Sequence, residues 1–159
     1  MDPLAAPPTL IGLTTYLLSK TGKAARSALA AELARRGLRL WHMAILAALA
    51  DFGPHAQREL ADRLAIDPSD LVKVIDELAT PGYVERTRDP ADRRRVRIVL
   101  TPAGRAALAD LHDRAATVQD VVLAPLSAAE RATLQALLLR VHAGMEETAR
   151  QAAAGSPPS

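Results

Sequence analysis

The sequence contains no cysteine among its 159 residues. This absence excludes disulfide bonds, thiolate zinc sites, cysteine nucleophiles and cysteine-based redox sensing. The four histidines offer no substitute, because no two of them are three or four residues apart, as ligands on one helix would be. We therefore expect neither a metal site nor a cofactor.

Aromatic residues and long apolar runs are also scarce. Only 3% of the residues are aromatic, and this disfavours RNA or single-strand binding, which relies on stacking. No segment reaches the ~18 apolar residues of a membrane-spanning helix. The opening MDPLAAPPTL lacks the basic start and apolar run of a signal peptide. We expect a soluble cytoplasmic protein without a membrane partner.

Catalytic motifs are missing as well. The serines are few and form no nucleophile elbow, and the eight glycines are scattered rather than gathered in a phosphate-binding loop. The carboxylates mostly lie among arginines on amphipathic helices, as on solvated faces. We expect no catalytic residues, so the chain is not predicted to be an enzyme.

Alanine and leucine dominate a hydrophobic content of 49%, which favours helices. The length fits one domain, 1–159. Flexible tails are expected over 1–8 and 151–159, which hold prolines and small residues. Helical periodicity and stop signals predict helices over 9–36, 38–53, 56–66, 67–80, 102–123 and 126–145.

The helix expected over 67–80 has two distinct faces. Asp67 is a suitable N-cap, Pro68 suits the first helical position, and Asp70 can close a capping box. One face carries an apolar stripe, and the other is too polar to be core. The stripe is Leu71, Ile75 and Leu78, and the polar face holds Ser69, Val72, Lys73 and Asp76.

A β-hairpin is predicted next. YVERTR and RRVRIVLT are joined by the turn sequence DPAD, and Thr101-Pro102 starts the following helix. Residues 83–105 contain seven basic and three acidic residues, a local net charge of +4 in a chain whose formal net charge is +2. The positive charge is therefore focused on the hairpin.

Two short helices followed by a hairpin form a winged helix-turn-helix. A helix in the major groove would reach base edges with its N-terminal half, and hairpin arginines suit phosphates and a narrow minor groove. The alternative is that the arginine-rich hairpin is only a solvated charged loop. The residues expected to contact double-stranded DNA are Ser69, Asp70, Val72, Lys73, Arg86, Arg88, Asp92, Arg93, Arg94 and Arg95.

Trp41 to Gly104 resembles the MarR family of bacterial transcription regulators. DPADRRRVRIVLTPAG is similar to the wing of that family, and LADRLAIDPSDLVKVIDELATPGYVER is similar to its helix-turn-helix. The wing residues that fall in register are Asp92, Arg94, Leu100, Thr101 and Gly104. Asp70 departs from the pattern, because serine or threonine is common there. An acid opposes phosphate unless it accepts from cytosine N4 or pairs with a neighbour such as Lys73.

The resemblance implies a mainly α fold with a small β-hairpin wing. It implies a DNA-binding lobe over 41–105, dimerisation helices over 9–36 and 106–148, and a homodimer on a pseudo-palindromic operator. Arg94 would enter the minor groove, and Asp92 would orient the wing arginines.

A cleft taking a small, frequently aromatic, effector is also implied, for which the candidates are Tyr16, Trp41, His42 and Met43. Core packing at the dimer junction is the alternative role of these four residues. The predicted function is a sequence-specific transcription regulator, a repressor released by an effector. A winged-helix protein-interaction module without a DNA role is the alternative.

Overall fold

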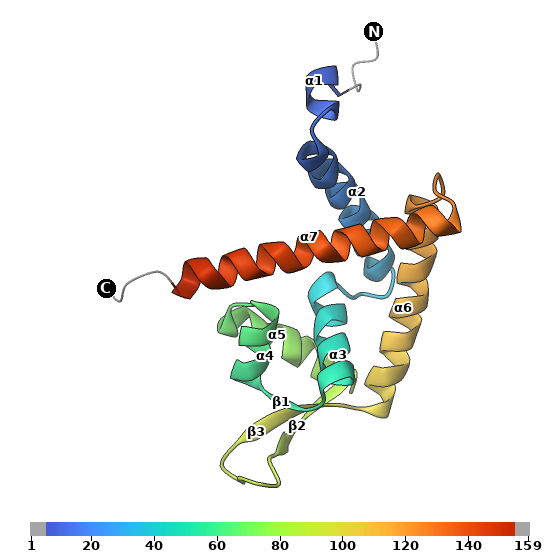
Figure 1. The fold of residues 1–159 in the computed structure, drawn as a ribbon. Helices are drawn as coiled ribbons and strands as arrows, with labels where there is room; N and C mark the ends of the chain where they lie inside the picture. Colours follow the sequence, from blue (N-terminus) through green and yellow to red (C-terminus); the bar gives the residue numbers. More distant parts are fainter. Residues whose placement is uncertain (1–5, 155–159) are drawn as a thin grey trace. The chain divides into compact units, whose positions relative to one another are not determined.

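The computed structural model describes residues 6–154, which fall into two compact units, one up to Gln119 and one from Asp120 onward (Figure 1). The elements of the first unit, in chain order, are α1 (Pro8–Ile11), α2 (Thr14–Ala34), α3 (Leu40–Phe52), β1 (His55–Ala56), α4 (Gln57–Leu64), α5 (Pro68–Ala79), β2 (Val84–Arg88), β3 (Val96–Leu100) and most of α6 (Pro102–Val122). The second unit contains the end of α6 and α7 (Ala128–Ala154).

The helix expected over 9–36 is interrupted. α1 ends at Ile11, and Leu13 adopts an extended conformation (φ −96°, ψ 113°) before α2 begins. Gly12 lies at the break, where its low helix propensity weakens the continuous helix that periodicity alone suggests. The expected stop at Gly37 is confirmed, because Gly37 has φ +68° and the Leu38 amide donates to the Leu33 carbonyl over 3.2 Å.

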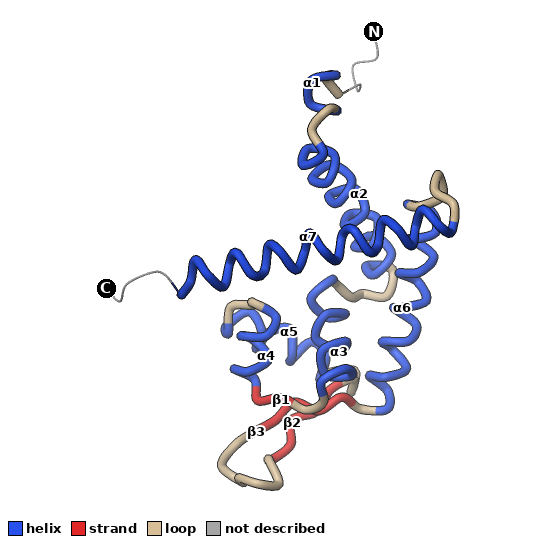
Figure 2. Tube along the Cα trace, in the orientation of Figure 1, coloured by secondary structure: helices blue, strands red, loops and turns tan. Residues whose placement is uncertain are grey.

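The predicted hairpin is confirmed, and a third strand joins it. β2 and β3 pair antiparallel with Val84 opposite Leu100 and Arg88 opposite Val96. β1 adds to the other edge of β3, giving the order β1-β3-β2, drawn in red in Figure 2. A two-residue strand has no periodicity, so β1 could not be predicted from the sequence. β1 is a strand only because it pairs with β3, with His55 opposite Ile98.

The core of the first unit lies between α3, α4, α5 and the sheet. Leu71, Ile75 and Leu78 are fully buried, as their spacing predicted, so the other face of α5 remains at the surface. The completely buried large side chains are Leu33, Ile45, Leu46, Leu49, Leu60, Leu71, Ile75, Leu78, Val84, Ile98 and Leu111. This packing fixes the position of α5 relative to the hairpin.

The junction between the hairpin and α6 is close-packed. Thr101 caps α6, because its Oγ1 accepts from the Gly104 amide over 3.0 Å. The same hydroxyl donates to the Gly82 carbonyl over 2.6 Å. Gly104 has no side chain, and a Cβ there would overlap the Tyr83 carbonyl and lie 2.6 Å from Leu100 Cδ1. Thr101 and Gly104 thus allow the base of the wing to pack directly against α6.

The second unit is the long helix α7 and the turn before it. A capping box precedes α7, because the Ser127 amide donates to Glu130 over 2.8 Å and the Glu130 amide donates to Ser127 Oγ. α7 extends through Ala154, four residues into the segment expected as a tail, and the rest of that tail, 155–159, lies outside the described residues, as does 1–5. No helix in the described part of the chain is long and apolar enough to cross a membrane.

Candidate nucleic-acid interface

α5 presents a polar face at the surface of the first unit. Asp67 caps it, and the amide and the hydroxyl of Ser69 both donate to Asp67 Oδ1, over 2.8 and 2.5 Å. These hydrogen bonds hold the pKa of Asp67 below its usual value. Asp70, expected to close a capping box, instead lies 3.6 Å from Lys73 Nζ. Val72, although apolar, remains 38% exposed beside this pair.

The tip of the hairpin is shaped by two aspartates. Asp89 accepts from the Ala91 amide over 2.9 Å, and Asp92 accepts from the Arg94 amide over 3.0 Å. Arg88 donates across the tip to the Arg93 carbonyl over 2.9 Å. Asp92 thus holds the backbone of Arg94, and among residues 6–154 its carboxylate forms no ion pair with an arginine side chain.

The arginines of the hairpin divide into two groups. Arg86 forms an ion pair with Asp76 of α5 over 2.6 Å, and Arg95 forms one with Glu59 of α4 over 3.3 Å. The side chains of Arg93 and Arg94 are exposed and make no hydrogen bond or ion pair with any residue between 6 and 154. Two uncompensated guanidinium groups therefore stand at the tip of the wing, while Arg86 and Arg95 are held against α5 and α4.

A buried histidine ties α5 to the start of α3. His42 is 3% exposed, and its Nδ1 accepts from the Arg39 amide over 2.9 Å. The proton must then lie on Nε2, which donates to Glu77 Oε2 over 2.7 Å. Arg39 also donates to Glu77. Burial lowers the pKa of His42, and the hydrogen bonds from His42 and Arg39 lower the pKa of Glu77.

The buried histidine predicts a pH dependence of stability. Burial lowers the pKa of His42 in the fold, so on acidification the unfolded chain takes up the proton before the folded chain does. The free energy of unfolding should therefore fall between about pH 7.5 and 5.5, the range of that titration. The lowered pKa of Glu77 acts only in more acidic solution, so it leaves this range unaffected. Urea unfolding of the wild type and of His42→Gln, which cannot titrate, measures the difference. An equally steep pH dependence in both proteins would contradict the assignment.

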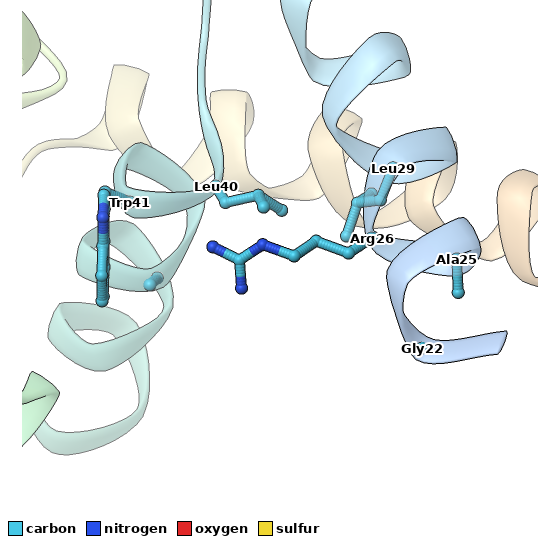
Figure 3. Close-up of a pocket in the computed structure, with 7 residues that line it drawn as sticks. Gly22, Ala25, Arg26, Leu29, Leu40 and Trp41 are labelled. Atoms are coloured by element: carbon cyan, nitrogen blue, oxygen red, sulfur yellow. The ribbon is translucent and has the colours of Figure 1, made fainter. Parts of the chain in front are cut away.

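A pocket of about 500 Å³ lies between α2 and α3. Its lining is apolar apart from Arg26, whose side chain extends from α2 toward the helix that carries Trp41 (Figure 3). Arg26 makes no hydrogen bond or ion pair among the described residues. The lining residues are Gly22, Ala25, Arg26, Leu29, Leu40, Trp41 and Ala44.

The four effector candidates lie in different environments. Trp41 lines the pocket and is 42% exposed. His42 is directed to Glu77, Met43 packs against the core, and Tyr16 lies under Lys20, whose Nζ is 5.6 Å from the ring centroid. None of these three lines the pocket. Within residues 6–154, no three histidine, aspartate or glutamate residues are grouped as metal ligands would be.

Sequence reasoning missed Arg26, Glu77 and Glu59. Arg26 had a usable signal, because it follows Gly22 by four residues and precedes Leu29 by three, so these residues share one helix face. Glu77 and Glu59 had none. Their partners, Arg39 and His42 for the one and Arg95 for the other, are more than thirty residues away in the chain.

Two short helices, a paired hairpin and an exposed cationic tip define a winged helix-turn-helix of the nucleic-acid-binding class. The model of the MarR family matches residues 36–95. A probable transcriptional regulator from Pseudomonas aeruginosa has a crystal structure that superposes with a TM-score of 0.69 at 32% identity, over 83% of this chain and 98% of that one. The chain belongs to the MarR family.

Two further relatives carry functional descriptions. The putative transcriptional regulatory protein for the hcr operon of Thauera aromatica is 38% identical over 93 residues, which cover 58% of this chain and 56% of that protein. BpsR of Bordetella bronchiseptica, whose DNA binding is regulated by 6-hydroxynicotinic acid, is 26% identical with a TM-score of 0.69, over 86% of this chain and 98% of that one. The match to the first therefore spans little more than half of its length.

Proposed function

We propose that this protein is a sequence-specific transcription regulator that binds double-stranded DNA. The observation that carries the proposal is the pair of uncompensated guanidinium groups, Arg93 and Arg94, at the tip of a wing beside the exposed face of α5. Guanidinium groups fit phosphates and the negative potential of a narrow minor groove. The relatives are transcription regulators, and the proposed role needs no catalytic group. We place its action in the cytoplasm.

A homodimer is part of the proposal. α7 buries none of its side chains, and apolar residues remain exposed along it, with Val141 48% and Met145 68% exposed. Leu13 and Leu17 near the N-terminus are 52% and 41% exposed. Surfaces this apolar favour association, and two-fold symmetry is the commonest solution. Two copies would place two α5 helices on half-sites about one helical turn, ~10 bp, apart.

In vitro selection from a randomised duplex library tests the DNA-binding proposal. The expected result is enrichment of a pseudo-palindrome whose half-site centres are about 10 bp apart. A library that remains random after selection would favour the alternative, a winged-helix protein-interaction module without a DNA role. That alternative also predicts binding to partners with little dependence on salt, whereas phosphate contacts release counterions and make DNA binding strongly salt-dependent.

The pocket supports regulation by a small aromatic acid. Trp41 offers a ring face, the other lining residues are apolar, and Arg26 supplies a cation without an internal partner. An aromatic carboxylate satisfies both groups, because a carboxylate accepts two hydrogen bonds from a guanidinium. BpsR is regulated by 6-hydroxynicotinic acid, a ligand of this class. Repression would be steric, and effector binding would release it by favouring a spacing of the two lobes that no longer matches the half-sites.

Replacing Arg26 with alanine should weaken the binding of 6-hydroxynicotinic acid, the probe for this class, by roughly tenfold or more, since a charged hydrogen bond is lost. The affinity for DNA should not change, because Arg26 belongs to α2 and not to the wing or α5. Titration calorimetry measures the first effect and fluorescence anisotropy the second. Lys23→Ala is the control, because Lys23 carries the same charge on α2 and does not line the pocket. Equal ligand binding by Arg26→Ala and Lys23→Ala would refute the assignment.

A further inference from the structure

The outward face of α5 is partly committed to internal contacts. The Ser69 hydroxyl donates to the N-cap Asp67 over 2.5 Å. Asp76 is held by Arg86 over 2.6 Å. Glu77 accepts from His42 over 2.7 Å. These three side chains position α5 against its own cap, against β2 and against α3, so they are poorly placed to make new hydrogen bonds.

The remaining polar side chains on the N-terminal half of that face are Asp70 and Lys73. They are 66% and 74% exposed, and their Oδ1 and Nζ atoms lie 3.6 Å apart. Residues three apart in a helix project from the same side, so the acceptor and the donor are presented together. In a helix-turn-helix, the N-terminal residues of the second helix are the ones that reach base edges. Asp70 is the third residue of α5.

We propose that Asp70 and Lys73 act as one unit that reads a single C·G base pair in each half-site. Asp70 accepts a hydrogen bond from the cytosine N4 amino group, and Lys73 donates to O6 and N7 of the paired guanine. The inference rests on the proposed DNA-binding function, and it names the specificity-determining residues of that function.

The major-groove edge of a C·G pair matches this arrangement. Cytosine N4 is a donor at one end of the edge, and guanine O6 and N7 are two acceptors side by side at the other. In an A·T pair the adenine N6 donor lies between two acceptors, N7 and thymine O4, so a carboxylate there meets acceptors on both sides. The adjacent acid and base therefore favour C·G over A·T.

Charge balance supports the same assignment. A lone aspartate at the DNA surface would be repelled by phosphates, but the ammonium group of Lys73 lies 3.6 Å from Asp70, so the pair adds no net charge. The wing supplies the net positive charge through Arg93 and Arg94. α5 then determines which base pair is preferred, and the wing tip adds affinity through its attraction to the phosphates.

Selection from a randomised duplex library with the wild type and Asp70→Ala tests the proposal. The wild type should enrich one C·G pair in each half-site, and exchanging it for T·A should lower affinity by roughly tenfold or more. In Asp70→Ala the same exchange should cost severalfold less than in the wild type, because only the contact of Lys73 with guanine remains, while the preferences at the other positions persist. Asp113→Ala is the matched control, because Asp113 is an exposed aspartate of α6 whose carboxylate forms no hydrogen bond or ion pair within the described range.

A second measurement uses only the wild-type protein. Replacing the paired guanine with 7-deazaguanine removes one acceptor of Lys73 without changing the protein, and it should weaken binding severalfold. An Asp70→Ala variant in which the exchange to T·A costs as much as in the wild type, or an unchanged affinity for the 7-deazaguanine duplex, would overturn the proposal. A wild-type protein that enriches no sequence would instead refute DNA binding itself.

Discussion

Replacing Arg94 with alanine should leave the fold intact and lower operator affinity by about 30-fold or more, because each protomer of a dimer loses a groove contact of ~1–3 kcal/mol. The fold is expected to survive because the Arg94 side chain has no partner among residues 6–154 and is exposed. The backbone turn is held by Asp92, which accepts from the Arg94 amide and not from its side chain. Anisotropy titration against the selected operator measures the loss.

The effect of Arg94→Ala should be compared with the effects of two further variants. Arg95→Ala should cost less, because Arg95 must first leave Glu59 before it can bind a phosphate. Lys23→Ala removes the same charge from α2 and should have little effect, which separates a specific contact from a change in net charge. Full operator affinity in Arg94→Ala, with an unchanged melting temperature, would refute the role of the wing tip.

Replacing Gly104 with alanine should lower the free energy of unfolding by at least about 3 kcal/mol. The new Cβ would overlap the Tyr83 carbonyl, a backbone atom that cannot turn away, and would lie 2.6 Å from Leu100 Cδ1. The start of α6 would be pushed from the base of the wing, where Thr101 binds the Gly82 carbonyl. The melting temperature should fall by roughly 6–12 °C, as differential scanning calorimetry would show.

Gly22→Ala is the control for that substitution. Gly22 lies within α2, and a Cβ there meets nothing within 4 Å. Alanine at this helical position should stabilise the protein by about 0.5–1 kcal/mol. Gly104→Ala with wild-type stability would contradict the close packing between the wing and α6.

Local signals in the sequence were sufficient for most of the fold. The N-cap Asp67, the stop at Gly37 and the capping box of Ser127 and Glu130 each depend on residues within a few positions of one another. Spacing alone also predicted which face of α5 is buried. These features are determined by contacts inside one helix or one turn, so they can be read in a single pass along the chain.

Long-range pairing could not be predicted in the same way. β1 exists only because β3 lies beside it. Ala65 ends α4 with φ 51°, a conformation that alanine rarely adopts. No sequence pattern predicted it. The division of the arginines into paired and unpaired groups depends on Glu59 and Asp76, which lie on other elements. The sequence therefore predicted which arginines lie on the hairpin, and the structure separates those with internal partners from Arg93 and Arg94.

The most direct test of DNA recognition is fluorescence anisotropy with the duplex upstream of the protein's own gene and with a scrambled duplex, at two salt concentrations. We expect tight, salt-dependent binding to the upstream duplex, with a preference of at least ~10³-fold over the scramble. Weak and equal binding to both duplexes, or no binding even at low salt, would contradict a regulator that recognises its own promoter region.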